Sequence, residues 1–471
     1  MTKIADSFSG YLNIDDEVFA YNVSNHKVTL LPAQSDQSSI YKAVDKIHKR
    51  EEAQGKEPSE FLFGYNGGYR IALLRKGAFH TDSFGINPVI QFATPLIIKS
   101  SGNTEYFYKT LSEDWNKFHA ITFCGGNINA LCSPEIAIER SKDKLRGNDG
   151  SGEIRILPWA DYSRSISFEI DGEKIELTIS ISRTWAANNA ERIGAYSLGE
   201  LNSFIRFSFE NAQDFDKFEK YYRIANEMIA ILTTQSNVSF EVYLSQRNSE
   251  NLYTKTALCK VFDGYDNYCA RRSHEVIPIY GIFDCLPNLV RNISRGKLTF
   301  LLSLLPDDNR DAHRITITNI QDLCTALEVA YRWSKRHSEK DALIEELKQR
   351  IKETISEFTE EHSEIDIYNQ TTIHSAFQYL DYTLKQRITT LYAENCAVID
   401  SIVSKWALQP VNEESIGSFV KLRNSRTHSG IVGFNDSVEL YSPLFALVYC
   451  CLLNHIGLCE ETIKSILLQV F

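Results

Sequence analysis

The sequence predicts an α+β protein of several domains, in which a β-rich N-terminal region precedes an all-α C-terminal helical bundle. Apolar and polar residues alternate between turn signals in the first part of the chain, whereas from about residue 317 apolar residues recur at helical spacing. A chain of 471 residues is also too long for one ordinary core. We therefore expect a β-rich domain over residues 1–188, a mixed α/β domain over 189–316 that packs on the first, and a helical domain over 317–471.

Composition and charge narrow the function classes. With 43% hydrophobic residues the chain can bury sizeable cores, and its net charge of −11 is unlike that of a general electrostatic nucleic-acid binder. Any nucleic-acid binding would need a local basic patch. The ten cysteines include no CxxC pair and no Cys/His cluster at zinc-finger spacing, and the first residues lack the apolar core of a signal peptide. These features indicate reduced thiols in a cytoplasmic protein.

Hairpins dominate the prediction for the β-rich region. The alternating runs on either side of Asp171-Gly172 predict a hairpin with one buried face, and the Asn-Gly-Gly turn inside residues 61–74 predicts another. Residues 147–152 are rich in glycine, but no Lys-Ser/Thr follows and a strand rather than a helix comes next. We therefore interpret residues 147–152 as a loop and not as a phosphate site. Three Trp residues of this region are expected to fill cores rather than to bind bases: Trp115, Trp159 and Trp185.

The mixed region combines both periodicities. Residues 211–234 carry a helical apolar stripe and predict a long amphipathic helix, and residues 238–244 alternate as a strand does. Residues 287–303 predict another helix with a break at Gly296.

From about residue 317 onward the chain is expected to be almost entirely helical. A charged helix is predicted over 339–362, a long one over 372–405, and one that carries the motif described below from about Glu413. The run Leu444–Ile456 is apolar nearly all round, but about 13 residues cannot span a bilayer core of ~30 Å. This run is therefore expected to be either a buried helix or a dimer face.

The stretch Lys421–Gly430 holds the least expected residue of the sequence. On a helical projection Ile416, Phe419 and Val420 form one apolar stripe, and Arg423 falls on the middle of it. A cation on a core-facing side is costly unless it is paired, and no acidic residue occurs between residues 415 and 435. Arg423 must therefore meet a carboxylate from elsewhere in the fold or be held for an anion.

The spacing of an Arg, four residues and a His is weak by itself, because it occurs three times. Arg75 with His80 lies in β-rich sequence beside a glycine, and Arg332 with His337 has Trp directly after its Arg. Only Arg423 is followed by a small polar residue, Asn424, on a late helix that also carries His428.

With these residues in view, the C-terminal part resembles the HEPN family of helical ribonuclease domains. The family signature is an Arg, a polar residue that is often Asn, a few more residues and then a His, on a helix that packs against a final apolar helix. Arg423, Asn424 and His428 match it, and residues 443–457 match the apolar helix. The whole layout resembles the ApeA type of bacterial anti-phage proteins, although no motif residues match in the N-terminal part.

The resemblance implies a metal-independent, dimeric endoribonuclease without a cofactor, whose two motif helices face each other across a two-fold axis. His428 would act as general base or acid, and Arg423 would hold the phosphate. Asn424 would fix the imidazole tautomer or bind the scissile phosphate. Lys421 and Arg426 would contribute positive charge toward RNA.

The resemblance also implies partners: RNA, with tRNA among the candidates, a second copy of the chain and a phage-derived trigger, but no membrane. Two other interpretations stay open. Arg423 could pair with Glu346 or Glu353 of the charged helix, with His428 placed only to suit the helix dipole. Alternatively, the domain could be a catalytically inactive HEPN-type module for dimerisation or for binding nucleotide or RNA.

Overall fold

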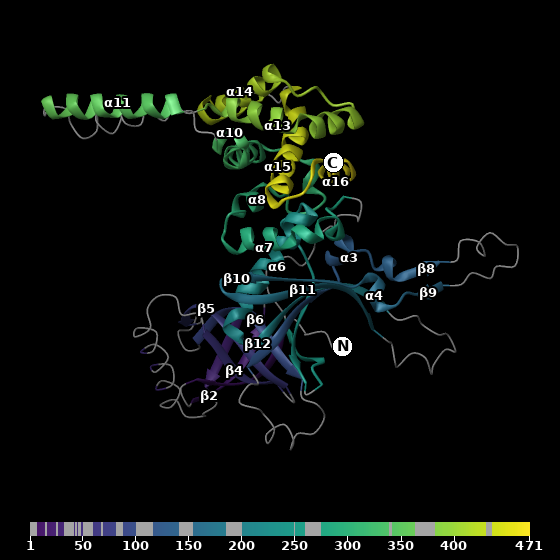
Figure 1. Ribbon diagram of the computed structural model, residues 1–471. Coiled ribbons are helices and arrows are strands. Elements are labelled where there is room, and N and C mark those ends of the chain that lie inside the picture. Colours follow the sequence, from purple (N-terminus) through teal and green to yellow (C-terminus); the bar gives the residue numbers. More distant parts are fainter. Residues whose placement is uncertain are drawn as a thin grey trace, which may run out of the picture. The chain divides into compact units, whose positions relative to one another are not determined.

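The computed structural model describes residues 7–14, 17–24, 27–32, 42, 45, 49, 60–66, 69–81, 88–99, 116–140, 154–184, 200–248, 250–259, 275–338, 342–362, 382–429 and 436–471. The chain forms two compact units (Figure 1). One comprises Met1–Ile229 and Asn237–Tyr268 and is called the β unit below. The other comprises Ala230–Ser236 and Cys269–Phe471 and is called the helical unit.

The α+β class predicted from the sequence is confirmed, with β-rich structure first and helices after it. The division into two units does not coincide with the predicted boundaries after residues 188 and 316, and three domains stay a prediction. The physical reason for the difference is strand pairing. β12 (Glu200–Asp214) and β13 (Glu241–Arg247) lie beyond residue 188 in sequence, yet both pair with β7 (Lys117–Cys124).

The β unit is built on one antiparallel sheet, with the strand order β10-β11-β12-β7-β13-β14-β6-β3-β2-β1-β4-β5, and β6 also pairs with β5. A separate pair joins β8 (Ile138–Arg140) and β9 (Ile154–Ile156). The remaining strands are β1 (Phe8–Ile14), β2 (Glu17–Ser24), β3 (Lys27–Pro32), β4 (Glu60–Asn66), β5 (Tyr69–Thr81), β6 (Pro88–Lys99), β10 (Arg164–Ile170), β11 (Glu173–Thr184) and β14 (Tyr253–Cys259).

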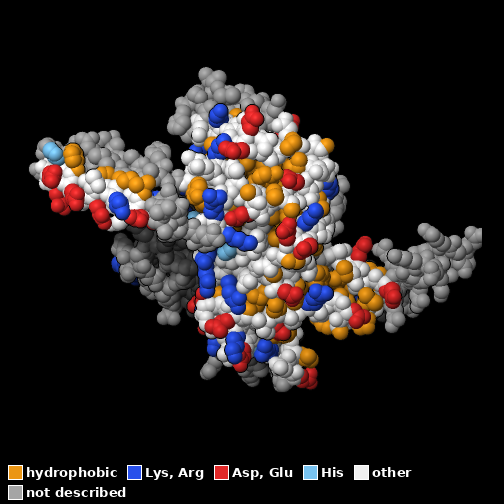
Figure 2. All heavy atoms as spheres, turned by 45° about the horizontal axis from the view of Figure 1, so that its top comes forward, with side chains coloured by type: hydrophobic (Ala, Val, Ile, Leu, Met, Phe, Trp, Pro, Cys, Tyr) orange, Lys and Arg blue, Asp and Glu red, His pale blue; other side chains and the backbone are white. Residues whose placement is uncertain are grey.

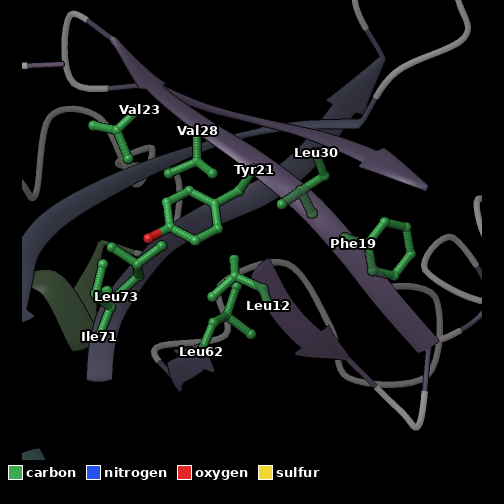
Figure 3. Close-up of a cluster of buried hydrophobic side chains, with 9 residues drawn as sticks. All are labelled: Leu12, Phe19, Tyr21, Val23, Val28, Leu30, Leu62, Ile71 and Leu73. Atoms are coloured by element: carbon green, nitrogen blue, oxygen red, sulfur yellow. The ribbon is translucent and has the colours of Figure 1, made fainter. Parts of the chain in front are cut away.

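Because β6 pairs with both β3 and β5, six of the strands form a closed ring. Its core is apolar and consists of alternate residues of the strands (Figure 3), which are Leu12, Phe19, Tyr21, Val23, Val28, Leu30, Leu62, Ile71 and Leu73. Tyr21 is 2% exposed, and its hydroxyl donates to the carbonyl of Tyr65 at 3.3 Å, so its polar atom is satisfied inside the ring.

α6 (Phe218–Thr233) packs against the remaining strands through aromatic contacts. Tyr221 lies 4.6 Å from the ring of Phe209 and 6.2 Å from that of Phe207, centroid to centroid, and both Phe residues belong to β12. The predicted helix over 211–234 was wrong at its start, since residues 211–214 still belong to β12. The predicted strand over 238–244 begins later, at Glu241, and continues to Arg247.

The predicted hairpins are confirmed by the strand pairing. Arg164 of β10 pairs with Ile179 of β11, and Asp171 and Gly172 of the turn have φ of 50° and 82°. Positive φ at both central residues is what a type I′ turn requires, which explains the Asp-Gly pair. β4 and β5 form the second hairpin. The glycine-rich residues 147–152 lie outside the described residues.

Trp159 departs from the expectation that the Trp residues fill cores. Its side chain is 49% exposed and stacks on Phe204, with ring centroids 5.9 Å apart. It belongs to α4 (Trp159–Tyr162), a four-residue helix, and another such helix among the described residues of the β unit is α3 (Ile128–Leu131). Trp115 and Trp185 lie outside the described residues.

The helical unit contains only helices among its described residues, as predicted for residues 317–471. The α-helices are α7 (Leu286–Ser294), α8 (Thr299–Leu304), α9 (Ile317–Ala330), α10 (Lys335–Ser338), α11 (Ala342–Glu361), α13 (Leu384–Trp406), α14 (Glu413–Ser429), α15 (Tyr441–Ile456) and α16 (Glu460–Val470). Short 3₁₀ turns accompany them at η3 (Ile279–Cys285), η4 (Asp311–His313), η5 (Tyr331–Trp333) and η7 (Asp436–Leu440). Gly296 separates α7 from α8, as expected.

α15 is the core helix of this unit. Every residue from Pro443 to Leu453 is buried, and the helix contacts α7, α9, α13 and α16. The hydroxyl of Tyr449 donates to the carbonyl of Ile231 at 2.9 Å. By length and composition, residues 438–456 would suffice to cross a membrane, but 72% of that span is buried inside the protein. Of the two expectations for this run, a buried helix is therefore confirmed, and its apolar character gives no support to a dimer face.

Candidate active site

The motif lies on α14, which begins where the sequence predicts. The side-chain oxygen of Asn412 accepts hydrogen bonds from the backbone N–H groups of Glu414 and Ser415, at 3.0 and 2.9 Å. Asn412 thus caps the helix, and Glu413 and Glu414 in the first turn suit the positive end of the helix dipole.

A narrow apolar stripe anchors α14. Ile416 and Phe419 are fully buried and Leu422 is 4% exposed, while the helix contacts α9 and α13. Val420, which the projection placed on the stripe, is only half-buried, so the buried stripe runs through Leu422 instead.

Arg423 continues this stripe to the surface. Its guanidinium is half-exposed, and Nη1 donates to Oδ1 of the exposed Asn424 at 3.1 Å. Burial raises the pKa of the Cys324 thiol on α9 to about 12, while the positive charge of Arg423 acts in the opposite direction and Glu328 reinforces the rise. The guanidinium therefore lies within electrostatic reach of α9, at the edge of the core.

For two of the remaining residues of the predicted site, the structure describes only the backbone. Lys421 is exposed on the same helix. The backbone of Arg426 and His428 belongs to α14, but their side chains lie outside the part of the molecule that the structure describes. The structure thus brings Arg423 and Asn424 into contact and puts His428 one helical turn beyond Asn424 along the same backbone.

The carboxylates suggested as structural partners of Arg423 bind other groups. Glu346 accepts from the guanidinium of Arg350, and Glu353 accepts from Nε2 of Gln349 at 2.7 Å. All four residues belong to α11, so these two carboxylates are engaged by their own helix.

The three copies of the Arg-to-His spacing have different backbones. Arg75 and His80 belong to strand β5. Arg332 lies in η5 and His337 in α10, and Ser334 between them is extended with φ −68° and ψ 148°. Among the three, only Arg423 and His428 lie on one continuous helix.

A shallow depression of about 580 Å³ adjoins the motif and is lined by Lys385, Glu413, Glu414, Gly417, Ser418, Val420 and Lys421. Lys385 of α13 crosses it, with Nζ 2.7 Å from Oε1 of Glu413. Gly417 leaves space for the Lys385 side chain, since a Cβ at position 417 would lie 3.4 Å from Cε of Lys385. Lys385 and Cys324 were not predicted near the site, because both are far from the motif in sequence and no local pattern marks them.

No protein-family model, no curated protein and no solved structure matches this chain. Its function is therefore inferred from the residues of α14 and their surroundings.

Proposed function

We propose that the chain is a metal-independent endoribonuclease of the HEPN type, which cleaves RNA at a dimer cleft with Arg423, Asn424 and His428. The observation that carries the proposal is the placement of Arg423. Its guanidinium emerges from a buried stripe, half-exposed and bonded to Asn424, on the only one of the three copies that lies on a continuous helix. Such a cation is held in position by packing, and the planar fork of a guanidinium suits the oxygens of a phosphate.

In the proposed reaction the 2′-hydroxyl of RNA attacks the adjacent phosphorus. A new P–O bond forms, the bond to the 5′-oxygen breaks, and the products carry a 2′,3′-cyclic phosphate and a 5′-hydroxyl. His428 takes the proton from the 2′-hydroxyl or gives one to the leaving 5′-oxygen, which suits a group with an unperturbed pKa near 6.5. Arg423 stabilises the charge on the pentavalent phosphate, and Asn424 orients Arg423 through their hydrogen bond.

A dimer would complete this site, because one helix supplies one Arg, one Asn and one His. Lys421 and Asn424 remain exposed beside the buried stripe, so this side of α14 is accessible to a second copy. We further propose that the chain acts in the cytoplasm in anti-phage (abortive infection) defence. In that role the β unit would restrain the nuclease and respond to a phage-derived trigger.

Incubation of the purified protein with total RNA in the presence of EDTA tests this function. We expect cleavage that persists in EDTA, leaves 2′,3′-cyclic phosphate ends and disappears in His428→Ala. Loss of cleavage on EDTA addition would overturn the metal-free reaction. Binding of RNA without cleavage by the unaltered protein would identify the chain as an inactive RNA-binding module instead.

A further inference from the structure

Two segments of the helical unit are strongly basic in an otherwise acidic protein. Residues 291–300 and 331–338 together contain six Lys and Arg residues and no Asp or Glu, whereas the whole chain carries a net charge of −11. Arg295 and Lys297 of the first segment and Arg332 and Lys335 of the second are exposed. Figure 2 shows Lys and Arg side chains lying beside exposed His side chains on the face in view.

Aromatic contacts bring the two segments together. The ring of Trp333 stacks on that of His455, at the end of α15, with centroids 4.5 Å apart and planes 9° from parallel. Phe300 of α8 lies 5.6 Å from Trp333 on the same measure. His455 is exposed and Trp333 is half-buried, so part of the stack is accessible to solvent.

Charged residues lie close to the stack of Trp333 and His455. Burial and the nearby Lys297 lower the pKa of His455, which favours the neutral ring in the stack. Arg336 lies 5.7 Å from the ring centroid of Tyr382, and its backbone N–H donates to Glu394 at 3.3 Å. Glu394 is thus one carboxylate beside this surface.

We infer that the surface formed by Arg295, Lys297, Arg332, Lys335, Trp333 and His455, called the basic patch below, binds a single-stranded segment of RNA. Unpaired bases can stack on the flat rings while the exposed cations bind the flanking phosphates. The bases of a duplex are already stacked and paired, so a duplex does not offer them. The inference rests on the proposed function only in taking this RNA to be the strand that α14 cleaves.

The basic patch and the candidate active site share one helix. α9 carries Cys324, within electrostatic reach of Arg423, and Trp333 follows the end of the same helix at Ala330. At 1.5 Å per residue, Ala330 lies roughly 9 Å beyond Cys324 along the axis. The basic patch therefore follows, along the same helix, the residue that lies within electrostatic reach of Arg423, and we expect one strand of RNA to contact both.

Fluorescence anisotropy of a labelled single-stranded oligoribonucleotide tests the inference, using the full-length chain with His428→Ala in the background to prevent cleavage. His455→Ala removes the exposed ring and should weaken binding roughly 5- to 150-fold, the range for one base–aromatic stack. Lys297→Ala with Lys335→Ala should weaken binding and flatten the slope of log K against log salt by about 1.4, at ~0.7 per phosphate contact. The matched control is Lys352→Ala, an exposed cation of α11, which should leave binding unchanged.

A duplex of the same sequence separates stacking from general attraction. We expect His455→Ala to leave duplex binding unchanged, and an equal loss for duplex and single strand would overturn the assignment of the rings to bases. Unaltered single-strand binding by the double lysine variant would overturn the basic patch itself. These outcomes are distinct from failure of the proposed function, because binding is measured without cleavage. In the active chain, the same variants should raise KM for long RNA while kcat stays within about twofold.

Discussion

Two stretches of the helical unit share the same spacing of Arg and His, yet their backbones give them different roles. Arg332 and His337 are separated by the extended Ser334, and both side chains are exposed. Arg423 and His428 lie on one uninterrupted helix, whose buried side chains hold the Arg at the edge of the core. The first stretch can contribute charge to a surface, whereas the second can hold two groups at a fixed separation. Of the two stretches, only the second has the regular, anchored backbone that the proposed site requires.

The largest expected effect separates the two histidines. His428→Ala should reduce RNA cleavage by roughly 10²–10⁴-fold, the contribution of a proton carrier, whereas His337→Ala should retain activity within about threefold. Initial rates on a labelled RNA measure both, and His80→Ala in strand β5 is a further control. The comparison fails if His337→Ala is the inactive variant.

Arg423→Ala tests the cation of the anchored stretch and should also reduce cleavage by roughly 10²–10³-fold. Arg423→Lys should recover little, because an ammonium does not reproduce the planar fork of a guanidinium. Since the side chain is half-exposed, thermal stability should fall by about 1 kcal/mol or less. Destabilisation by several kcal/mol would mean that Arg423 serves the fold and not the reaction.

The anchoring itself is tested by Phe419→Ala. Phe419 is fully buried on α14, so its truncation should lower the free energy of unfolding by about 3–5 kcal/mol. The matched exposed position is Trp406, 54% exposed, where an Ala substitution should cost about 1 kcal/mol or less. Urea unfolding at equilibrium measures both, and similar values would show that the buried stripe does not hold the helix.

A smaller effect concerns the thiol of Cys324 on α9, which lies within electrostatic reach of Arg423. The thiol pKa of Cys324 rises from 9.0 to about 12 on folding, so the unfolded chain binds fewer protons than the native one between these values. Stability is therefore complete below about pH 9 and falls as the pH rises toward 12, by up to about 1.4 kcal/mol per unit for this group. Cys324→Ala should make the fall shallower between about pH 9 and 11 in urea unfolding.

The matched control for that experiment is the exposed Cys396→Ala, which should keep the slope of the unaltered chain. Arg423→Ala provides a second variant. Removal of the cation should raise the pKa of Cys324 further, and an unchanged thiol pKa in Arg423→Ala would separate Arg423 from α9.

The smallest expected effect concerns Ser334, the extended residue that separates Arg332 from His337. The hydroxyl of Ser334 accepts from the N–H of His337 at 3.0 Å, so Ser334→Ala should cost about 1 kcal/mol through loss of this local bond. Cleavage should not change, because continuity of this backbone is not part of the proposed site. A gain of activity in Ser334→Ala would show that the two stretches are interchangeable.

Local patterns predicted much of the fold. The Asp-Gly turn, the alternating strands around it and the helical periodicity after residue 317 are local signals, and the structure has the corresponding elements. Residues 211–214 were misassigned because the apolar stripe begins only at Phe215, and helical periodicity did not locate where the strand before it ends.

Some features of the candidate site were also predictable from local sequence, and others were not. Helical spacing predicted Arg423 on the middle of an apolar stripe that included Val420, whereas the structure shows Arg423 half-exposed at the edge of a stripe that runs through Leu422. Its neighbour Cys324 lies about a hundred residues away in sequence, and Lys385 comes from another helix, so only tertiary packing brings them near. The stack of Trp333 on His455 could not be predicted either, because no local sequence rule pairs residues from η5 and α15.

The path of the chain between its units has a practical consequence for dissecting the protein. Residues 230–236 belong to the helical unit, although the segments before and after them belong to the β unit. A recombinant fragment starting at residue 317 would therefore omit α7, α8 and the carbonyl of Ile231 that accepts from Tyr449. Such a fragment would expose part of the surface of α15 to water and invite aggregation. Toxicity or inactivity of a truncated gene product would then report on folding as much as on regulation, and full-length variants are the informative reagents.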